Sequence, residues 1–482
     1  MVAVGDLVAA FAVTGTVGAS LAAWEAVQRR TGMEREVVRK YAHAMSCTLC
    51  AAGVFFVNSW EAVSAMSLAA AGLLVVVVER QMLPGLLHAG RARDYGIVLS
   101  AVALAVVVWL FWPNRPVIAG ALLILALADP LAAWVGGQWG RHRVRAWNSN
   151  RSLEGGAAFL VASFLISLVV LGHAAGGPPG AREVALAAFI AVTAACVELM
   201  VPSALDNLAV TVWAAFFLDI AVRTDAGDAA RWAGAMVASG GAAVAFFKLG
   251  WLDAAGAVGS VLVSAPAVAL GGWSWILPIA AFFASSSILT KFAQADARAR
   301  GPRNLRQVLI NGAFPLLPPV LVYAVTGNAV WFQIAAGGSA AANADTWATE
   351  VGRLAPRPPF FLRTLRPVPA GTSGAVSYLG MTAMLLGAVV IGVVAALASN
   401  PRALLPVTLA GIGGALFDSA LGAWGQARFR CPACHRVGET REHCRVGGQV
   451  ASGIPWLDND LVNLAANLCG MLIVVALAAT GR

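Results

Sequence analysis

Residues 381–398 read MTAMLLGAVVIGVVAALA, an apolar run without a single charged side chain. A helix needs about 20 such residues to cross the hydrocarbon core of a bilayer. Similar runs recur at residues 97–112, 159–171 and 461–479, and only 12% of the 482 residues are charged. A soluble protein has about twice that share. We therefore predict an all-α, polytopic transmembrane protein of about 14 spans, because a helix satisfies its own backbone hydrogen bonds in lipid.

The basic residues gather in five connections between the apolar runs, while connections such as 172–179 carry almost none. These basic loops are residues 29–40, 141–151, 291–306, 353–366 and 428–445. Clusters of Lys and Arg mark the cytoplasmic side of a membrane. We therefore expect a bacterial inner-membrane protein whose functional sites face the cytoplasm. The net charge of +9 then follows from membrane topology and does not indicate a nucleic-acid partner.

The two halves of the chain resemble one another. Residues 128–136 read ADPLAAWVG and residues 344–352 read ADTWATEVG, so that Asp129 and Asp345 each stand seven residues before a Gly. Membrane proteins built from repeats often use equivalent parts of each copy for their sites. The alternative is chance similarity between Ala- and Gly-rich segments. The polar stretch 223–231 marks the boundary of the two predicted modules, residues 1–228 and 229–482.

Further correspondences lie downstream of each Asp. An Arg-rich loop is followed by Gly155-Gly156 in the first half and by Gly371–Gly374 in the second. Each half then has an Asp-Asn pair, Asp206-Asn207 and Asp458-Asn459, with Asp418 as a competing partner in the second. These pairings predict one polar site in each module.

Several carboxylates interrupt or flank the apolar runs: Asp129, Glu198, Asp206, Asp345, Asp418 and Asp458. An ionisable residue inside an apolar segment is a functional candidate by default, because its burial is costly. Helix capping or helix pairing is the alternative for any one of them. Carboxylates beside Asn suit Mg²⁺, Arg and Lys suit phosphate oxygens, and glycine lets backbone N–H groups approach a phosphate. The combination predicts phosphoryl transfer, although no Walker lysine loop or protein-kinase signature is present.

A compact metal-ligand pattern lies in the last basic loop. Cys431 and Cys434 are spaced by two residues, and His443 and Cys444 follow. These four side chains, or His435 in place of His443, could complete a tetrahedral structural Zn²⁺ site. The alternative is a reduced loop with incidental thiols. The other four cysteines lie in apolar runs and are expected to be packing residues.

The motifs of the first half resemble the phytol kinase and dolichol kinase family. The matching segments are residues 39–43, 93–96, 129–140, 151–155 and 198–207. The second half resembles the integral-membrane family that contains plant and cyanobacterial phytyl-phosphate kinase. Its matching segments are residues 285–291, 307–312, 343–352, 368–374, 418–419, 431–444 and 458–460.

The resemblance implies a bifunctional enzyme. The first module would phosphorylate a phytol-like isoprenoid alcohol, and the second would convert the monophosphate to the diphosphate, with Mg²⁺ and CTP (or ATP) as the donor. His43 would be the base for the alcohol, acting with Asp129, Glu198, Asp206, Asp345, Asp418 and Asp458 as the catalytic set. Mg²⁺ would lie at Asp129, Asp206, Asp345 and Asp458. Nucleotide and phosphate would contact Arg39, Lys40, Arg93, Arg151, Glu154, Gly155, Asn207, Lys291, Asn311, Thr346, Glu350, Gly371, Thr372, Asn459 and Asp460.

Three alternatives stay open at this stage. A cytidylyltransferase would form a CDP-lipid instead of a phosphate ester. A lipid-phosphate transporter would also place carboxylates within the membrane. Finally, one half could have lost activity and serve as a scaffold.

Overall fold

The structure is a computed structural model that describes residues 3–84, 95–146, 149–202, 205–293, 301–435, 437–439, 441–444 and 446–480. The chain divides into two compact units, Met1–Met236 and Val237–Arg482. This division falls inside helix α11 (Ala226–Lys248), as does the boundary that the sequence places after Asp228. Each unit is described by itself.

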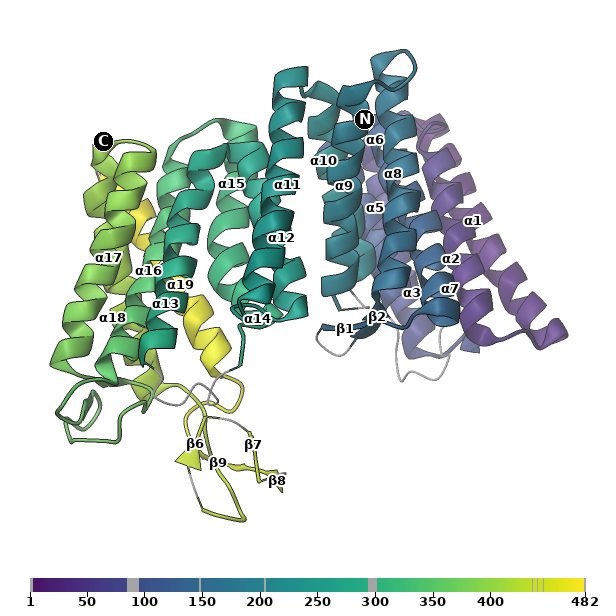
Figure 1. Cartoon of the computed structure of the whole chain (residues 1–482). Helices are drawn as coiled ribbons and strands as arrows, with labels where there is room; N and C mark the ends of the chain where they lie inside the picture. Colours follow the sequence, from purple (N-terminus) through teal and green to yellow (C-terminus); the bar gives the residue numbers. More distant parts are fainter. Residues whose placement is uncertain are drawn as a thin grey trace. The chain divides into compact units, whose positions relative to one another are not determined.

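The first unit is a bundle of helices with one short hairpin (Figure 1). Its helices are α1 (Val4–Thr31), α2 (Arg35–Gly53), α3 (Trp60–Glu79), α5 (Gly96–Phe111), α6 (Arg115–Leu123), the π-helical turn η1 (Ile124–Ala128), α7 (Asp129–Trp139), α8 (Leu153–Ala175), α9 (Ala181–Met200) and α10 (Asp206–Arg223). Strands β1 (Arg143–Ala146) and β2 (Ser149–Ser152) pair antiparallel between α7 and α8. The hairpin ends at Ser152, whose hydroxyl caps α8 by accepting from the Gly155 N–H at 3.1 Å.

The second unit is also helical, and its strands lie in two connections. Its helices are α12 (Ala254–Gly271), η2 (Trp273–Ile276), α13 (Leu277–Ala293), α14 (Leu305–Val308), η3 (Leu309–Ala313), α15 (Phe314–Thr326), α16 (Val330–Gly352), α17 (Tyr378–Ala398), η4 (Pro401–Ala403), α18 (Leu404–Trp424) and α19 (Asn459–Thr480). Strands β3 (Phe360–Phe361) and β4 (Ala375–Val376) pair before α17. Between α18 and α19 lie a sheet of order β6-β5-β9 and the hairpin β7–β8. Their bounds are β5 (Arg428–Arg430), β6 (Val437–Gly438), β7 (Glu442–His443), β8 (Val446–Gly447) and β9 (Gln449–Ser452).

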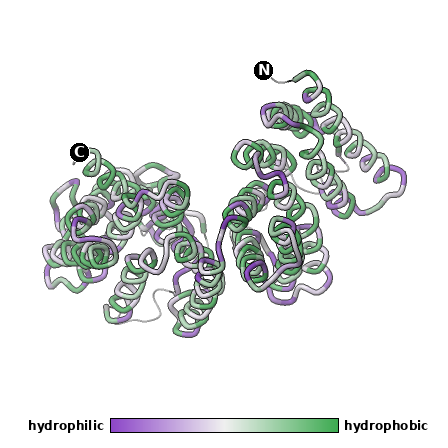
Figure 2. The backbone as a smooth tube through the Cα atoms, turned by 90° about the horizontal axis from the view of Figure 1, so that it is seen from above, coloured by the Kyte–Doolittle hydropathy of each residue, from purple (hydrophilic) through white to green (hydrophobic). Residues whose placement is uncertain are grey.

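The protein is an all-α polytopic membrane protein, as the sequence predicts. Among the described residues, 11 helices are long and apolar enough to cross a membrane, fewer than the 14 or so expected. Helices α2, α10, α11 and α16 are of comparable length but more polar, and α5 is shorter. Figure 2 shows hydrophobic residues along the helices of each unit and hydrophilic residues mainly in the connections.

Helix α16 is the centre of the second unit and contacts α17, α18 and α19. Its residues 335–344 are small and buried, which lets neighbouring backbones come close. A Cβ added at Gly414 of α18 would lie 2.4 Å from the Ala341 Cβ, and one at Gly470 of α19 would lie 2.8 Å from the Gly337 carbonyl oxygen. The carboxylates of α16 are therefore held on a closely packed helix.

Each unit contains a π-helical turn that a proline follows. In the first unit η1 ends at Ala128, and Pro130 occupies the second position of α7. In the second unit η3 ends at Ala313 and Pro315 occupies the same position of α15. Proline has no N–H for the normal helical hydrogen bond, and wide turns of this kind are frequent at functional sites. In the first unit this turn places Asp129 at the junction of two helical segments.

Candidate functional site

A polar pocket of about 290 Å³ lies within the first unit. Its walls come from α2, α5, α7, the β1–β2 hairpin, α8, α9 and α10. The predicted site residues that line it are Arg39, Lys40, His43, Asp129, Arg151, Gly155, Glu198, Asp206 and Asn207. Folding therefore brings side chains from four distant stretches of sequence into one cavity.

Three carboxylates converge in this pocket. Asp129 begins α7, Glu198 lies in the last turn of α9, and Asp206 begins α10. One carboxylate oxygen of each lies within 4.8 Å of the others, and all three residues are buried. Oxygen atoms at such separations suit a divalent cation that keeps several waters or phosphate oxygens as its other ligands. The donor set therefore fits Mg²⁺.

Two basic side chains balance these carboxylates. The Lys40 Nζ donates to the Asp129 Oδ2 at 2.6 Å. The Arg151 guanidinium contacts Glu198 through Nη1 and donates to the Asp206 Oδ2 through Nη2 at 2.6 Å. Burial alone would lower the pKa of Arg151, but the charges of Glu198 and Asp206 outweigh it and raise this pKa above its usual value. The pocket thus holds fixed positive charge where phosphate groups could bind.

Other predicted residues line the pocket with contacts of their own. The His43 Nε2 lies 3.9 Å from the Cys47 Sγ, one helical turn further along α2. The Asn207 Nδ2 donates to the Gly96 carbonyl at 2.9 Å and to the Ser100 Oγ at 3.0 Å. The Arg39 Nε donates to the Glu36 Oε2 at 3.1 Å. The Asn207 side chain therefore links α10 to α5, and its amide nitrogen is already engaged in structural hydrogen bonds.

One predicted residue of the first unit that the structure describes lies outside this pocket. Glu154 does not line the pocket, because its Oε1 pairs with the His142 Nδ1 at 2.7 Å. Arg93 falls outside the described residues. Conversely, Glu36, Arg143 and Ser152 line the pocket and were not singled out from the sequence. Only Arg143 gave a signal, as a member of a basic loop.

The two units share one local arrangement of glycine and serine. In the first, a Cβ on Gly136 would lie 2.8 Å from the Ser152 Oγ and 3.6 Å from the Gly155 Cα. In the second, a Cβ on Gly352 would lie 3.2 Å from the Ser377 Oγ and 3.4 Å from the Gly380 Cα.

The serines also play the same role, since the Ser377 Oγ accepts from the Gly380 N–H at 3.1 Å, as Ser152 does from Gly155. In this local contact Gly380, and not Gly371–Gly374, takes the position in the second unit that Gly155 takes in the first. The glycine-rich composition of residues 371–374 had obscured the Ser-x-x-Gly spacing that the two helix starts share.

The second unit gathers a different set of charges around α16. Asp345 lies within electrostatic range of Glu350 and Asp418, and Glu439 of the β6 connection acts on Asp418 as well. The Asp418 Oδ2 is buried and has no hydrogen-bond partner among the described residues. A buried carboxylate oxygen without a partner is costly and could be satisfied by a cation.

Arg303 is a cation near this set that the sequence did not single out, and Arg353 pairs with Glu350 at 3.7 Å. Arg303 precedes α14 and lies over the rings of Phe282 and Phe283 at 5.5 and 5.1 Å. Burial lowers its pKa to about 10, and the charge of Glu350 opposes the shift. Arg303 therefore stays charged at neutral pH and faces the acidic end of α16.

The remaining predicted residues of the second unit lie in other contacts. Asp458 caps α19 by accepting from the Leu461 N–H at 3.0 Å, and Asp460 pairs with Arg306 at 3.3 Å. The Asn311 Oδ1 accepts from Asn467 at 3.0 Å. Three more side chains donate to backbone carbonyl groups: Lys291 to Leu249, Thr346 to Ala342 and Thr372 to Pro369. Gly371 has a positive φ of 84°, and Asn459 is exposed at the start of α19. A magnesium role for Asp458 stays a prediction.

The predicted zinc ligands are brought together in part. Cys431, Cys434 and Cys444 have their sulfur atoms within 4.8 Å of one another. Hydrogen bonding with Cys434, together with that to Cys431, raises the pKa of the Cys444 thiol. The side chain of His443 lies outside the described residues.

Comparison with known proteins gives one matching family model and three relevant relatives. Residues 237–471 match the family model described as Integral membrane protein DUF92. A phytol kinase of Synechocystis sp. is 29% identical over 206 residues, which cover 41% of this chain and 85% of that protein. Protein PGR of Arabidopsis thaliana is 30% identical over 224 residues, 39% of this chain and 75% of that protein.

An uncharacterized membrane protein of Methanocaldococcus jannaschii, MJ0933, is 32% identical over 178 residues, which cover 36% of this chain and 74% of that protein. No solved structure matches the chain.

Proposed function

This chain belongs to the DUF92 integral membrane protein family through residues 237–471, and from that premise we propose that it is a membrane-embedded isoprenoid kinase. The phytol kinase similarity supports phosphoryl transfer to a prenyl alcohol. We propose further that the first unit forms the monophosphate and the second adds another phosphate.

The observation that carries the proposal is the charge pattern of the first pocket. Three carboxylates stand within 4.8 Å of one another, and Lys40 and Arg151 contact them directly. Phosphoryl transfer needs mostly positioning and charge neutralisation, which a metal ion and basic side chains provide together. A bound Mg²⁺ would be held by these carboxylates and would neutralise phosphate oxygens. Lys40 and Arg151 could then turn from the carboxylates to the nucleotide phosphates.

An apolar pocket beside the polar one supports a lipid substrate. It measures about 110 Å³ and is lined mainly by apolar residues of α1, α2, α3 and α5. His43 lines the polar pocket and Cys47, one turn later on α2, lines the apolar pocket. On α5, Gly96 lines the polar pocket and Ile97 the apolar one. A prenyl alcohol could therefore lie with its chain in the apolar pocket and its hydroxyl near His43.

His43 is the residue that we assign to the proton of the alcohol. A neutral hydroxyl must lose its proton as it attacks a phosphoryl group, and a histidine within hydrogen-bond reach is suited to accept it. A monophosphate is already ionised and needs no such base. In the second unit, the matching segment 307–312 begins with Gln307, which is not a base, and its side chain is used in the capping box of α14 with Asn304.

The second unit is proposed to bind the monophosphate beside Asp345 and Asp418. The buried Oδ2 of Asp418 and the neighbouring charge of Asp345 favour a divalent cation there. Arg303 would hold phosphate oxygens. We propose CTP as the phosphoryl donor, with ATP as the alternative donor. We also propose that the enzyme lies in the inner membrane and that its two sites face the cytoplasm. The Asp129 and Asp345 segments would be copies of one ancestral module.

The decisive experiment uses purified full-length protein with labelled CTP or ATP, Mg²⁺ and a panel of isoprenoid alcohols and monophosphates. We expect Asp129→Asn to abolish alcohol phosphorylation and to spare the monophosphate reaction. We expect the opposite of Asp345→Asn.

Four results would overturn parts of this proposal. Loss of both steps in both folded variants rejects two separate sites. A CDP ester as product makes the protein a cytidylyltransferase, and nucleotide-independent flux of lipid phosphate in proteoliposomes makes it a transporter. If one of the two variants changes neither step, the unit that carries the substituted residue is a scaffold.

A further inference from the structure

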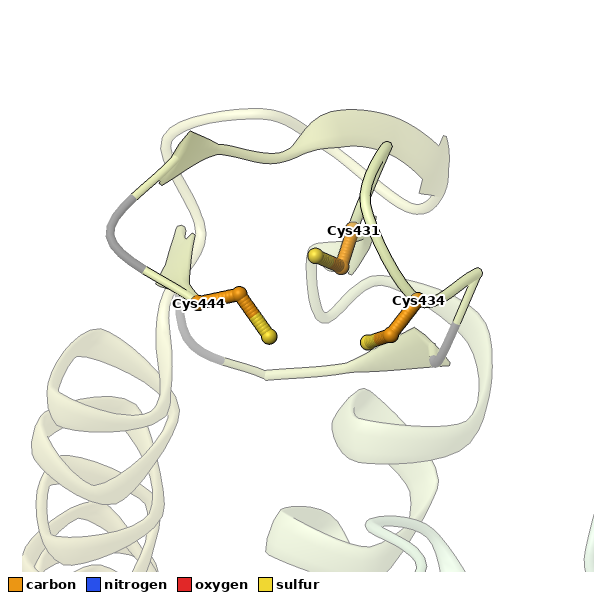
Figure 3. Close-up of side chains that lie close together, drawn as sticks. All are labelled: Cys431, Cys434 and Cys444. Atoms are coloured by element: carbon orange, nitrogen blue, oxygen red, sulfur yellow. The ribbon is translucent and has the colours of Figure 1, made fainter.

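The connection between α18 and α19 brings three cysteines to one point. Cys431 and Cys434 lie in the turn after β5, and Cys444 follows β7 in a separate hairpin. Figure 3 shows the three side chains pointing toward a shared centre. Their sulfur atoms all lie within 4.8 Å of one another. None of the three is in a disulfide. We propose that these thiols bind a Zn²⁺ ion that ties the hairpin to the turn.

The spacing fits zinc chemistry. Zinc lies about 2.3 Å from each thiolate, so sulfur atoms at the corners of its tetrahedron are about 3.8 Å apart. Small side-chain rotations bring sulfur atoms that start within 4.8 Å to that separation. His435 is not part of the group formed by the described side chains. The three thiols therefore supply three ligands, and the fourth is not a cysteine.

The backbone at Cys444 is a second, independent observation. Strands β7 and β8 pair Glu442 with Gly447 and His443 with Val446, so the hairpin turn starts at Cys444. Its φ is +53°. Two-residue hairpin turns require a positive φ here and strongly favour Asn or Gly. A cysteine at this position costs conformational energy, which metal binding by its sulfur would offset.

The segment that carries the three cysteines also reaches the surroundings of the second candidate site. Glu439, which lies between Cys434 and Cys444 in sequence, is within electrostatic range of Asp418, whose Oδ2 is buried. The Arg428 Nη2 of β5 donates to the Ser373 carbonyl at 2.7 Å, and its guanidinium lies 4.8 Å from the centre of the Phe361 ring. Zinc would therefore hold this connection against the α16–α17 loop. This positioning role rests on the proposed function, whereas the metal site itself does not.

Two other uses of these cysteines fit less well. A disulfide formed by any two of these cysteines would leave the thiol of the third packed beside the S–S bond and without a role. The sequence Cys431-Pro-Ala-Cys434-His435 also has the spacing of c-type haem attachment. However, the Cys444 sulfur lies within 4.8 Å of the other two, and c-type haem attachment has no role for a third thiol.

The test is metal analysis of the full-length protein, purified through a tag without histidine and in the absence of chelator. We expect one zinc per chain. Cobalt exchanged into the site should give thiolate-to-cobalt charge-transfer absorption. The test variants are Cys434→Ser and Cys444→Asn, because Asn suits the left-handed turn and removes only the sulfur. Cys469→Ser, a cysteine of α19 outside the triad, is the matched control.

Zinc should fall by at least tenfold in both test variants and stay unchanged in the control. Trypsin should then cut the variants faster at Arg430 and Arg441. Wild-type protein that neither contains zinc nor takes it up, a haem absorption band, or full zinc in both test variants would overturn the proposal.

The proposed positioning role has its own readout. Zinc loss should lower monophosphate phosphorylation and leave the alcohol step within about twofold. An equal loss of both steps rejects the role. If the wild type phosphorylates neither substrate, the proposed function fails, while the metal content still decides whether the site exists.

Discussion

The Lys40 Nζ lies 2.6 Å from the Asp129 Oδ2, although the two residues are 89 positions apart in the chain. Lys40 belongs to α2 and Asp129 to the first turn of α7, so this ion pair fixes α2 against the π-helical junction. Both side chains are largely buried, at 20% and 10% exposure. The pair is therefore a sensitive point for both stability and catalysis.

Lys40→Met should destabilise the first unit by about 3 kcal/mol, because it leaves the Asp129 carboxylate buried without its cation. The double variant Lys40→Met/Asp129→Asn should recover most of this loss, since no uncompensated charge is left. Thermal unfolding in detergent measures both effects. If the double variant is no more stable than Lys40→Met, the loss of stability does not come from breaking the Lys40–Asp129 ion pair. Alcohol phosphorylation should be absent in both variants.

Gly136→Ala should disturb the contact between α7 and α8. The added Cβ would lie 2.8 Å from the Ser152 Oγ, whereas nothing lies within 4 Å of a Cβ on Gly137. We expect Gly136→Ala to cost about 1–3 kcal/mol and to impair the alcohol step. Gly137→Ala is the control and should be neutral or slightly stabilising. Equal unfolding temperatures for the two variants would contradict the close packing described here.

His43→Gln should slow alcohol phosphorylation by about 10²–10⁴-fold, because a glutamine cannot accept the proton of the hydroxyl. Monophosphate phosphorylation by the same protein serves as the internal control and should not change. The two initial rates are measured on one preparation. Normal alcohol turnover in the variant would exclude His43 as the base.

Ala70→Leu should shorten the isoprenoid chain that the first unit accepts. Ala70 lines the apolar pocket on α3, while its neighbour Ala69 is exposed and does not line it. The leucine should raise KM for long-chain alcohols by about tenfold or more relative to short ones, since it fills part of a pocket of about 110 Å³. Ala69→Leu is the matched control. If both variants change chain-length preference alike, the chain does not lie in this pocket.

Arg303→Gln should weaken monophosphate binding by about 10- to 100-fold, because a charge-assisted contact to phosphate is worth about 1.5–3 kcal/mol. Arg306→Gln removes an exposed arginine paired with Asp460 and should change KM by less than about twofold. Arg303→Lys should recover part of the affinity. Equal KM values for the two Gln variants would remove Arg303 from the site.

Much of the first site could be predicted from sequence because each of its groups carries a local signal. Asp129 and Glu198 stand out as charges beside apolar runs, and Arg151 lies in a basic loop. Glu36 and Ser152 had no such signal, since polar residues at helix starts are common. Glu154 looked equivalent to its neighbours in the motif, but it pairs with His142 instead of entering the pocket.

The second site was harder to predict because its parts come from long connections of different length. The glycines at 371–374 matched the expected composition, while Gly380 takes the position of Gly155 in the local contact and was recognised only through its contacts with Ser377 and Gly352. Arg303 comes within electrostatic range of Glu350, and Glu439 within range of Asp418, although each pair is separated by more than 20 positions in sequence.

The sequence by itself determined that this protein is a bundle of helices in a membrane. The transfer of apolar side chains into lipid and the hydrogen bonding of the backbone act on each segment separately. The composition and length of each apolar run therefore suffice to predict a membrane-spanning helix. Only the tertiary structure decided that Lys40 meets Asp129 and that Arg151 bridges Glu198 and Asp206. Such pairs depend on how elements distant in sequence approach one another, as where Gly136 of α7 and Gly155 of α8 allow close contact between α7, which carries Asp129, and the helix that follows Arg151.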